Sequence, residues 1–246
     1  MFYLYAAPAV RMSALQHLQV IHVATHDSIG MGEDGPTHQP IELAALYRAM
    51  PNLLYIRPGD SEETAGAWLT AIESKNTPTI ISTSRHAVPQ LTPKTDRHSV
   101  RKGAYVLEEE ANADLTILGV GAELSLATDV AAELRSQGLR VRVVSFPSQR
   151  LFEKQSKDYK RSTLLRGSGV ASVVIEPYAA NGWERYADAA ICMSVDRFGK
   201  SLPGPQAYEY FGFTVENASK QIQSFLAQRR SGDIMPGEFV ELTCRH

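Results

Sequence analysis

Length, composition and charge narrow the class of protein before any motif is considered. The chain has 246 residues, of which 43% are hydrophobic and 21% charged, and its formal net charge is −2. These values are typical of a globular protein with one large or two ordinary domains. They exclude the clustered positive charge of a nucleic-acid surface, and no apolar run reaches the ~20 residues that span a membrane. The cysteines, Cys192 and Cys244, lie far apart without metal-ligand spacing, which predicts reduced thiols and a cytoplasmic location.

The first strand is predicted close to the amino terminus. Phe2 to Leu15 combines aromatic residues, alanines and a helical pattern. Val20 to Ala24 is short and rich in β-branched residues, which is typical of a strand buried on both faces of a parallel sheet. Pro40 and the helically spaced apolar residues from Ile41 to Met50 then predict a helix.

Between this strand and this helix lies a polar stretch, from His26 to His38. It contains two histidines, three carboxylates and three glycines. A loop at the carboxyl end of a strand is where open α/β sheets bind ligands. Glycines allow positive φ angles and a close approach of the backbone to a ligand, and imidazoles transfer protons near neutral pH. The stretch is therefore the first candidate for a functional site.

Two further strands complete the first unit. Asn52 to Arg57 and Thr77 to Ser84 both have the apolar character of buried strands, and Arg85 follows the second directly. Between them, Asp60 and Glu63 have the spacing of a capping box at the start of a helix. The apolar face of that helix is predicted to comprise Ala65, Trp68, Leu69 and Ile72. The alternation of strands and helices predicts a parallel α/β sheet with right-handed crossovers.

A change of composition separates this unit from a second one. Pro89 to Lys102 is rich in proline, threonine and charge, which is typical of a linker. Further on, we predict strands over 115–121, 141–145, 172–176 and 189–195 and helices over 122–136 and 216–229. The expected organisation is a first domain over 1–92, a linker over 93–112, a second domain over 113–230, and a tail of unknown role over 231–246.

The polar stretch also resembles a known family signature. Thr25 to Pro40, THDSIGMGEDGPTHQP, is similar without interruption to the signature of the transketolase pyrimidine-binding domain. Five later segments resemble the transketolase C-terminal domain: Gly103 to Leu107, Gly119-x-Gly121-x-Glu123, Arg142 to Ser145, Asp196 to Gly199, and Phe211 to Thr214. The resemblance covers Phe2 to Arg229 and implies an α/β fold of two three-layer units with largely parallel sheets. The first unit would be an incomplete thiamine-diphosphate pyrimidine-type domain.

The resemblance implies roles for four polar residues. Transketolases transfer a two-carbon ketol unit between sugar phosphates with thiamine diphosphate. By this likeness, His26 and His38 act in catalysis and also contact the substrate, and Asp34 hydrogen-bonds a substrate hydroxyl. Arg85 binds the substrate phosphate, for which a planar guanidinium is well suited.

The resemblance also implies cofactor contacts. Phe2 and Tyr5 correspond to family aromatics that pack around the aminopyrimidine ring, although ordinary core packing explains them equally well. The magnesium that accompanies thiamine diphosphate is bound by another domain in the family. A zinc site built from His26, Glu33, Asp34 and His38 lacks helical HExxH spacing, so we expect no metal site in this chain.

Three hypotheses for the function stay open. By this likeness, the family's diphosphate-binding domain and cofactor-activating glutamate are expected to lie outside this sequence. No acidic residue precedes Asp27 that could replace the glutamate. The chain is thus expected to carry the substrate-side half of a transketolase site, to form a composite enzyme as a homo- or hetero-oligomer with a transketolase-like chain, or to be an inactive paralogue that binds such a chain. The acceptor is expected to be a sugar phosphate, with formaldehyde, as in dihydroxyacetone synthase, as the alternative.

Overall fold

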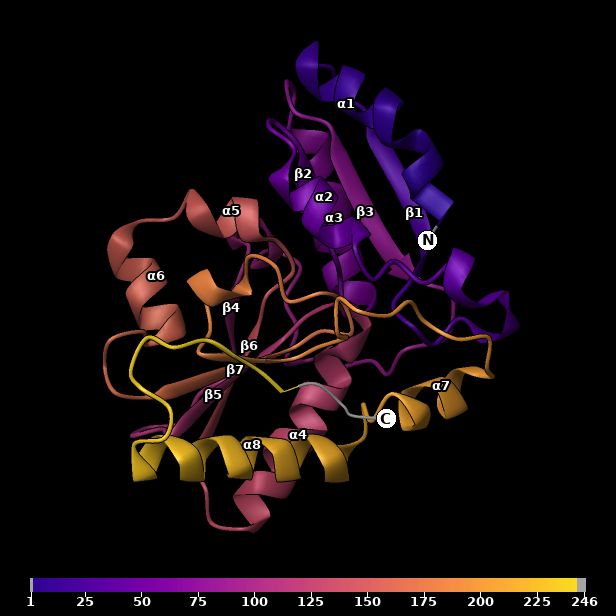
Figure 1. The fold of residues 1–246 in the computed structure, drawn as a ribbon. Coiled ribbons are helices and arrows are strands. Elements are labelled where there is room, and N and C mark those ends of the chain that lie inside the picture. Colours follow the sequence, from indigo (N-terminus) through magenta and orange to yellow (C-terminus); the bar gives the residue numbers. More distant parts are fainter. Residues whose placement is uncertain (1, 243–246) are drawn as a thin grey trace.

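Two α/β units, each built on its own sheet, make up the computed structural model (Figure 1). It describes residues 2–242, apart from the side chain of Phe2. The elements of the first unit are η1 (Phe2–Ala6), α1 (Ala7–Leu15), β1 (Ile21–Asp27), η2 (Gly32–Thr37), α2 (Leu43–Ala49), β2 (Leu54–Ile56), α3 (Ser61–Glu73), β3 (Thr79–Ser84) and η3 (Val100–Lys102). Those of the second are β4 (Tyr105–Glu108), β5 (Leu115–Gly119), η4 (Gly121–Glu123), α4 (Leu124–Ser136), β6 (Val141–Ser145), α5 (Gln149–Glu153), α6 (Lys157–Leu164), β7 (Ala171–Ile175), η5 (Trp183–Arg185), β8 (Ala189–Ile191), α7 (Gly204–Tyr210), α8 (Val215–Ser231) and β9 (Val240–Glu241).

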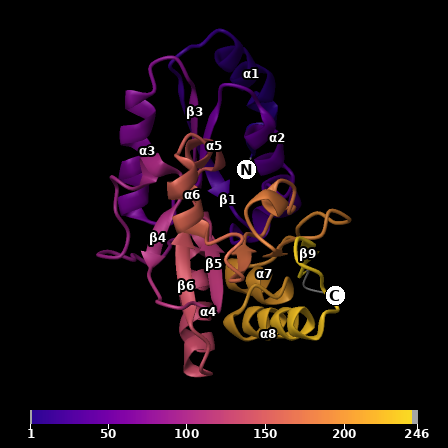
Figure 2. The same cartoon turned by 90° about the vertical axis from the view of Figure 1, so that its left-hand side faces the viewer.

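The first sheet has three parallel strands in the order β1-β3-β2. Side chains of α1 and α2 pack on one face of this sheet, where Tyr47 and Ile80 are fully buried. Ala67 and Ala71 of α3 pack on the other face against Ile81. Figure 2 shows α3 on one side of the strands and α1 and α2 on the other. The predicted three-layer arrangement is therefore confirmed for this unit.

The second sheet has six strands in the order β4-β6-β5-β7-β8-β9, and all pairings except β4–β6 are parallel. Helices α4 and α8 cover one face. The other face is covered by an aromatic cluster in which Phe146 lies edge-on to Phe152, Trp183 and Tyr186. The chain steps from β5 to β6 on one side and then to β7 on the other, so the strand order reverses at β5. In open α/β sheets, ligands bind outside the carboxyl ends of the strands at such a point.

Two short strands lie in segments for which no strand was predicted. The stretch expected to be a linker, 93–112, contains β4, which pairs antiparallel with β6. The tail, for which the sequence suggested no role, contributes β9, which pairs with β8 at the edge of the second sheet. Both strands are short and only partly buried, so they lack the apolar run that identifies a central strand.

Helix α3 begins where the sequence predicted, but it packs through a different face. The Asp60 carboxylate accepts a hydrogen bond from the Glu63 amide at 2.9 Å, as expected for a helix cap. Trp68, Leu69 and Ile72 are 40%, 41% and 51% exposed, so the predicted apolar face was wrong. The buried residues of α3 are instead mostly small: Glu63, Gly66, Ala67, Thr70 and Ala71.

Candidate functional site

The end of β1 is irregular, and this irregularity sets the direction of His26. Ala24 pairs with Ser82 and Asp27 pairs with Ser84, so two residues of β1 lie opposite one residue of β3. His26 and Ser28 both have a φ of 69°, in the left-handed region that residues with a Cβ rarely adopt. A bulge of this kind redirects a side chain. His26 is directed to the surface, whereas Asp27 and Ser28 are buried.

The four predicted polar residues lie around the carboxyl ends of β1 and β3. Asp34 lies between two nitrogen groups: its Oδ2 is 3.5 Å from His26 Nε2 and 3.6 Å from Arg85 Nε. The imidazole rings of His26 and His38 are 5.4 Å apart between centroids. Because β1 and β3 are neighbouring parallel strands, their carboxyl ends bring the polar stretch and Arg85 to one edge. The structure thus brings all four predicted polar residues into one cluster.

A hollow of about 540 Å³ opens beside the two histidines. We call it the His26 hollow; its lining residues are Tyr3, Tyr5, Ala6, Val23, Ala24, Thr25, His26 and His38. Tyr5, predicted from the family likeness, is among them, and the side chain of Phe2 lies outside the described part of the chain. Tyr3 was not predicted as a site residue, because an aromatic in an apolar amino-terminal segment has no signal that separates it from core.

A threonine hydroxyl lies beside each of the two imidazoles, and burial affects the charge of His26. The Thr25 hydroxyl lies 2.8 Å from His26 Nδ1, and the Thr37 hydroxyl lies 2.8 Å from His38 Nδ1. Partial burial lowers the pKa of His26, and the Asp34 carboxylate opposes this by favouring the imidazolium. His26 is therefore a neutral imidazole at pH 7 that can accept a proton.

Asp27 belongs to a different cluster from the other carboxylates of the polar stretch. Its carboxylate accepts hydrogen bonds from Arg57 at 2.7–3.0 Å, and all of these atoms are buried. Arg57 also pairs with Glu123, which follows β5, and with Glu176, which follows β7. We call this group of Arg57, Asp27, Glu123 and Glu176 the Arg57 cluster. It joins the first unit to the second. The cluster was not predicted from the sequence, because its members are far apart along the chain.

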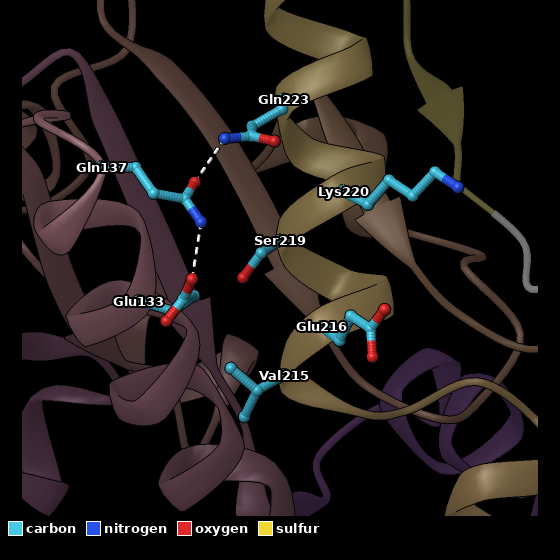
Figure 3. A pocket seen from close by; sticks show the side chains of 7 residues that line it. All are labelled: Glu133, Gln137, Val215, Glu216, Ser219, Lys220 and Gln223. Atoms are coloured by element: carbon cyan, nitrogen blue, oxygen red, sulfur yellow. Dashed lines mark hydrogen bonds between the residues drawn. The ribbon is translucent and has the colours of Figure 1, made fainter.

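A second hollow, of about 480 Å³, lies between α4 and α8 (Figure 3). Gln223 donates a hydrogen bond to Gln137, which donates in turn to Glu133 at 2.6 Å. No residue of the polar stretch lines this hollow. Of its polar side chains, Gln223, Gln137 and Glu133 are bonded to one another, and the buried Ser219 hydroxyl has no hydrogen-bond partner. It offers no converging set of reactive side chains.

The structure also bears on metal ligands, membrane-spanning helices and the two cysteines. Within residues 2–242, no group of three or more His, Cys, Asp or Glu side chains is arranged to hold a metal ion. None of the helices in that part of the chain is both long and apolar enough to cross a bilayer. Cys192 is buried and Cys244 lies outside the described residues, so the cytoplasmic location stays a prediction.

Comparison with known families explains this arrangement. Residues 1–90 match the family model "Transketolase, pyrimidine binding domain", and residues 103–214 match "Transketolase-like TK C-terminal domain". The chain belongs to the transketolase family. The predicted α/β fold of the family is confirmed as well, with mostly parallel sheets in both units.

Individual members of the transketolase family match most of this chain. It is 52% identical over 243 residues to dihydroxyacetone synthase of Candida boidinii, which covers 99% of this chain and 34% of that protein. A transketolase of Pichia stipitis in complex with sedoheptulose-7-phosphate superimposes with a TM-score of 0.88 at 42% identity, covering 94% of this chain and 33% of that one. The chain thus spans about a third of the length of these relatives.

A split-gene member of the family is also similar. It is described as an inactive β4 tetramer and superimposes with a TM-score of 0.66 at 26% identity, covering 85% of this chain and 67% of that one. The structural neighbours therefore include a sugar-phosphate complex and an oligomer encoded by a split gene.

Proposed function

We propose that this chain carries the substrate-side half of a transketolase-type site for ketol transfer. The observation that supports the proposal is the cluster of His26, Asp34, His38 and Arg85 at the carboxyl edge of the first sheet. Imidazole, carboxylate and guanidinium groups together suit a phosphorylated polyol, which has one dianionic end and several hydroxyls.

Each side chain has a role that its chemistry supports. The Arg85 side chain is 56% exposed, so its guanidinium can bind a phosphate through two parallel hydrogen bonds. Asp34 accepts a hydrogen bond from a substrate hydroxyl and so selects its configuration. His26 and His38, whose Nδ1 atoms lie near threonine hydroxyls, hold or transfer protons at Nε2 near the substrate carbonyl.

The His26 hollow fits one part of thiamine diphosphate. Its tyrosines suit the flat pyrimidine ring, and Tyr3 and Tyr5 are the aromatic residues of this chain that would hold it. None of the residues lining the hollow is a carboxylate that could bind magnesium. When bound, the cofactor would supply the carbanion chemistry that breaks and forms the carbon–carbon bond. We therefore propose that the diphosphate and magnesium are bound by residues outside this chain.

Substrate binding and turnover provide separate tests. We expect the purified chain to bind sedoheptulose-7-phosphate in a calorimeter and Arg85→Met to bind it about 10- to 100-fold more weakly, because a charged hydrogen bond contributes roughly 1.5–3 kcal/mol. The matched control is Arg101→Met, an exposed arginine on η3, which should bind like the wild type. Equal affinities of wild type and Arg85→Met would refute the phosphate site. Turnover by the chain alone, with thiamine diphosphate, magnesium, a ketose phosphate and an aldose phosphate, would refute the half-site.

Two alternatives have specific support. The 52% identity to a dihydroxyacetone synthase favours formaldehyde as the acceptor; comparison of formaldehyde with aldose phosphates in a reconstituted complex distinguishes the two. The similarity to an inactive split-gene tetramer supports a non-catalytic subunit that binds a transketolase-like chain. In that case the two chains should co-elute in size-exclusion chromatography, and His38→Ala should leave the activity of the complex unchanged.

A further inference from the structure

The carboxyl edge of the second sheet has the features of a ligand crevice. The strand order reverses at β5, which places the crevice between the segments that follow β5 and β7. Gly121 follows β5 with a φ of +59°, and a Cβ at this position would lie 2.9 Å from Arg57 Nη2. Glu123 and Glu176 flank the crevice and are buried. A glycine turn between two buried carboxylates is suited to a planar cation.

The occupant of the crevice is the side chain of Arg57, which belongs to the first unit. Its Nη2 lies 3.1 Å from Glu123, and its Nη1 donates to Glu176. The guanidinium stacks over the ring of Tyr178, 4.1 Å from the ring centroid. The Arg57 backbone amide donates to the carbonyl of Pro147, beyond β6, at 2.9 Å. Segments that follow three neighbouring strands of the second sheet thus converge on one residue of the first unit.

The same guanidinium also contacts Asp27, which belongs to the signature stretch Thr25 to Pro40. Arg57 Nε and Nη2 donate to the Asp27 carboxylate at 2.7–3.0 Å. The Tyr178 hydroxyl donates a hydrogen bond to the Asp27 carboxylate and accepts one from the Ser28 amide at 3.0 Å. Ser28 Oγ donates to Glu123. The residues on the carboxyl side of His26 are therefore anchored in the second unit, and this anchoring holds the left-handed backbone of His26 and Ser28.

We propose that Arg57 is a positioning residue. It fills the ligand crevice of the second unit and, through Asp27, directs His26 toward the His26 hollow, on the side where the substrate would bind. The second unit then serves as a docking platform for the signature residues, and its crevice is closed to other ligands while the units are docked. The inference rests on the proposed function only in one respect: the proposed function is what assigns His26 a role in catalysis.

Charge at the crevice is consistent with a filled site. Two arginines, Arg48 and Arg57, are paired with the three buried carboxylates of Asp27, Glu123 and Glu176. Burial raises the pKa of Glu123 to about 7, which allows this carboxyl to carry the proton that balances the cluster. The arginines hold the pKa of Glu176 down to about 2. With Glu123 protonated, the cluster together with Arg48 is therefore neutral with Arg57 in place and carries one unbalanced negative charge without it.

Nuclear magnetic resonance of the histidine ring protons in the full chain tests the proposal without requiring turnover. We expect Arg57→Ala to raise the pKa of His26 toward the ordinary value of about 6.5, and to broaden its signal, because the ring is no longer held in the hollow. Methylguanidinium at millimolar concentration should refill the crevice and restore the wild-type signal. The matched control is Arg142→Ala, which removes another buried arginine, bonded to Glu109 and Thr163. It should leave His26 unchanged with or without methylguanidinium.

A second variant covers the case in which Arg57→Ala does not fold. Tyr178→Phe keeps the ring over Arg57 but removes the hydroxyl that contacts Asp27 and Ser28. We expect the His26 signal to move in the same direction, by a smaller amount. A wild-type His26 titration in a folded Arg57→Ala or Tyr178→Phe protein would overturn the proposal. Failure of the proposed function would appear instead as unchanged sugar-phosphate binding in Arg85→Met.

Discussion

Asp34 lies between an imidazole and a guanidinium, and its carboxylate is one of the groups that affect the charge of His26. The carboxylate is 3.5 Å from His26 Nε2 and 3.6 Å from Arg85 Nε. It favours the imidazolium, while burial of the ring and the positive charge of Arg85 disfavour it. Burial is the largest of these effects, so the pKa of His26 lies below its ordinary value. A phosphate bound at Arg85 would add negative charge nearby and raise this pKa.

The first prediction concerns the charge of this cluster. Asp34→Asn removes the group that favours the imidazolium, so the pKa of His26 should fall further, by about 0.1 to 0.7 pH units for a half-exposed pair. Arg85→Met removes a positive charge that disfavours the imidazolium, so the pKa of His26 should rise. A titration of the His26 ring protons by NMR measures both effects. Glu33→Gln, at a neighbouring exposed carboxylate, serves as the control and should leave His26 unchanged. A higher pKa in Asp34→Asn would contradict the prediction.

Residues of the site differ in how far the sequence could reveal them. His26, Asp34 and His38 lie in one short stretch, and Arg85 directly follows a predicted strand, so local pattern and strand polarity were enough to bring them together. The partners of Arg57 are 30, 66 and 119 positions away from it. Asp27 belongs to the same sheet as Arg57, but Glu123 and Glu176 become its neighbours only because the two sheets dock. Asp27 is the residue whose role is hardest to predict, because the bulge at His26 sends it inward.

Helix α3 illustrates how packing at the scale of an element can reverse an apolar pattern. Its bulky residues, Trp68, Leu69 and Ile72, are exposed, while Gly66 and Ala67 are buried. A Cβ at Gly66 would lie 2.3 Å from the carbonyl oxygen of Arg97 and 2.6 Å from Val100. The segment before β4 therefore lies directly against the helix, and only small side chains fit between them.

The second prediction follows from this close contact. Gly66→Ala normally stabilises the interior of a helix by up to about 1 kcal/mol, but here the added methyl group meets backbone. We expect a loss of about 1–3 kcal/mol in the free energy of unfolding, measured by urea denaturation. The control on the same helix is Leu69→Ala, at an exposed position, which should change stability by no more than about 0.5 kcal/mol. A stabilised Gly66→Ala variant would show that the segment before β4 does not pack on α3.

Strands were predictable where their residues are mostly apolar or β-branched, which includes β1, although β1 is an edge strand and Val23 is 47% exposed. Strands β5, β6 and β7 are central and entirely buried, so each is mostly apolar in the sequence, with interior polar residues at Thr116, Arg142 and Ser172. Strand β4 is mostly half-buried, with Glu108 paired to Lys94 and Arg135, and its charged residues resemble a linker. Edge strands depend on tertiary pairing more than on local composition, which is why β4 and β9 were missed.

At the scale of the whole molecule, buried polar groups join the two units. Arg48 and Arg57 from the first unit pair with Glu176 of the second. Glu63 of α3 accepts hydrogen bonds from Tyr105 and Ser145 of the second unit. Buried polar contacts of this kind specify one relative orientation, because any other would leave charged groups without partners. The stability of the junction therefore depends on the protonation of its carboxyls.

The third prediction uses Glu123 to test that dependence. Burial raises its pKa from 4.5 to about 7 in the folded protein, so the folded chain keeps a proton that the unfolded chain loses. Its contribution to stability is fully present below pH 4.5 and is lost as the pH rises toward 7. Glu123→Gln keeps the shape and cannot titrate. The unfolding free energy of the wild type, relative to that of Glu123→Gln, should therefore fall by about 3 kcal/mol between pH 4.5 and 7.5.

Urea denaturation of both proteins across this pH range measures the difference directly. The comparison cancels the other groups that titrate, because they are present in both proteins. Burial lowers the pKa of His22, His26 and His86, which makes stability rise with pH. Burial raises the pKa of Glu63, which makes stability fall with pH. Glu176 titrates below this range, because its pKa is about 2. If the difference stays constant with pH, Glu123 is charged throughout and the Arg57 cluster carries a net negative charge. If the difference falls as expected, the junction between the units is weakest where Glu123 loses its proton.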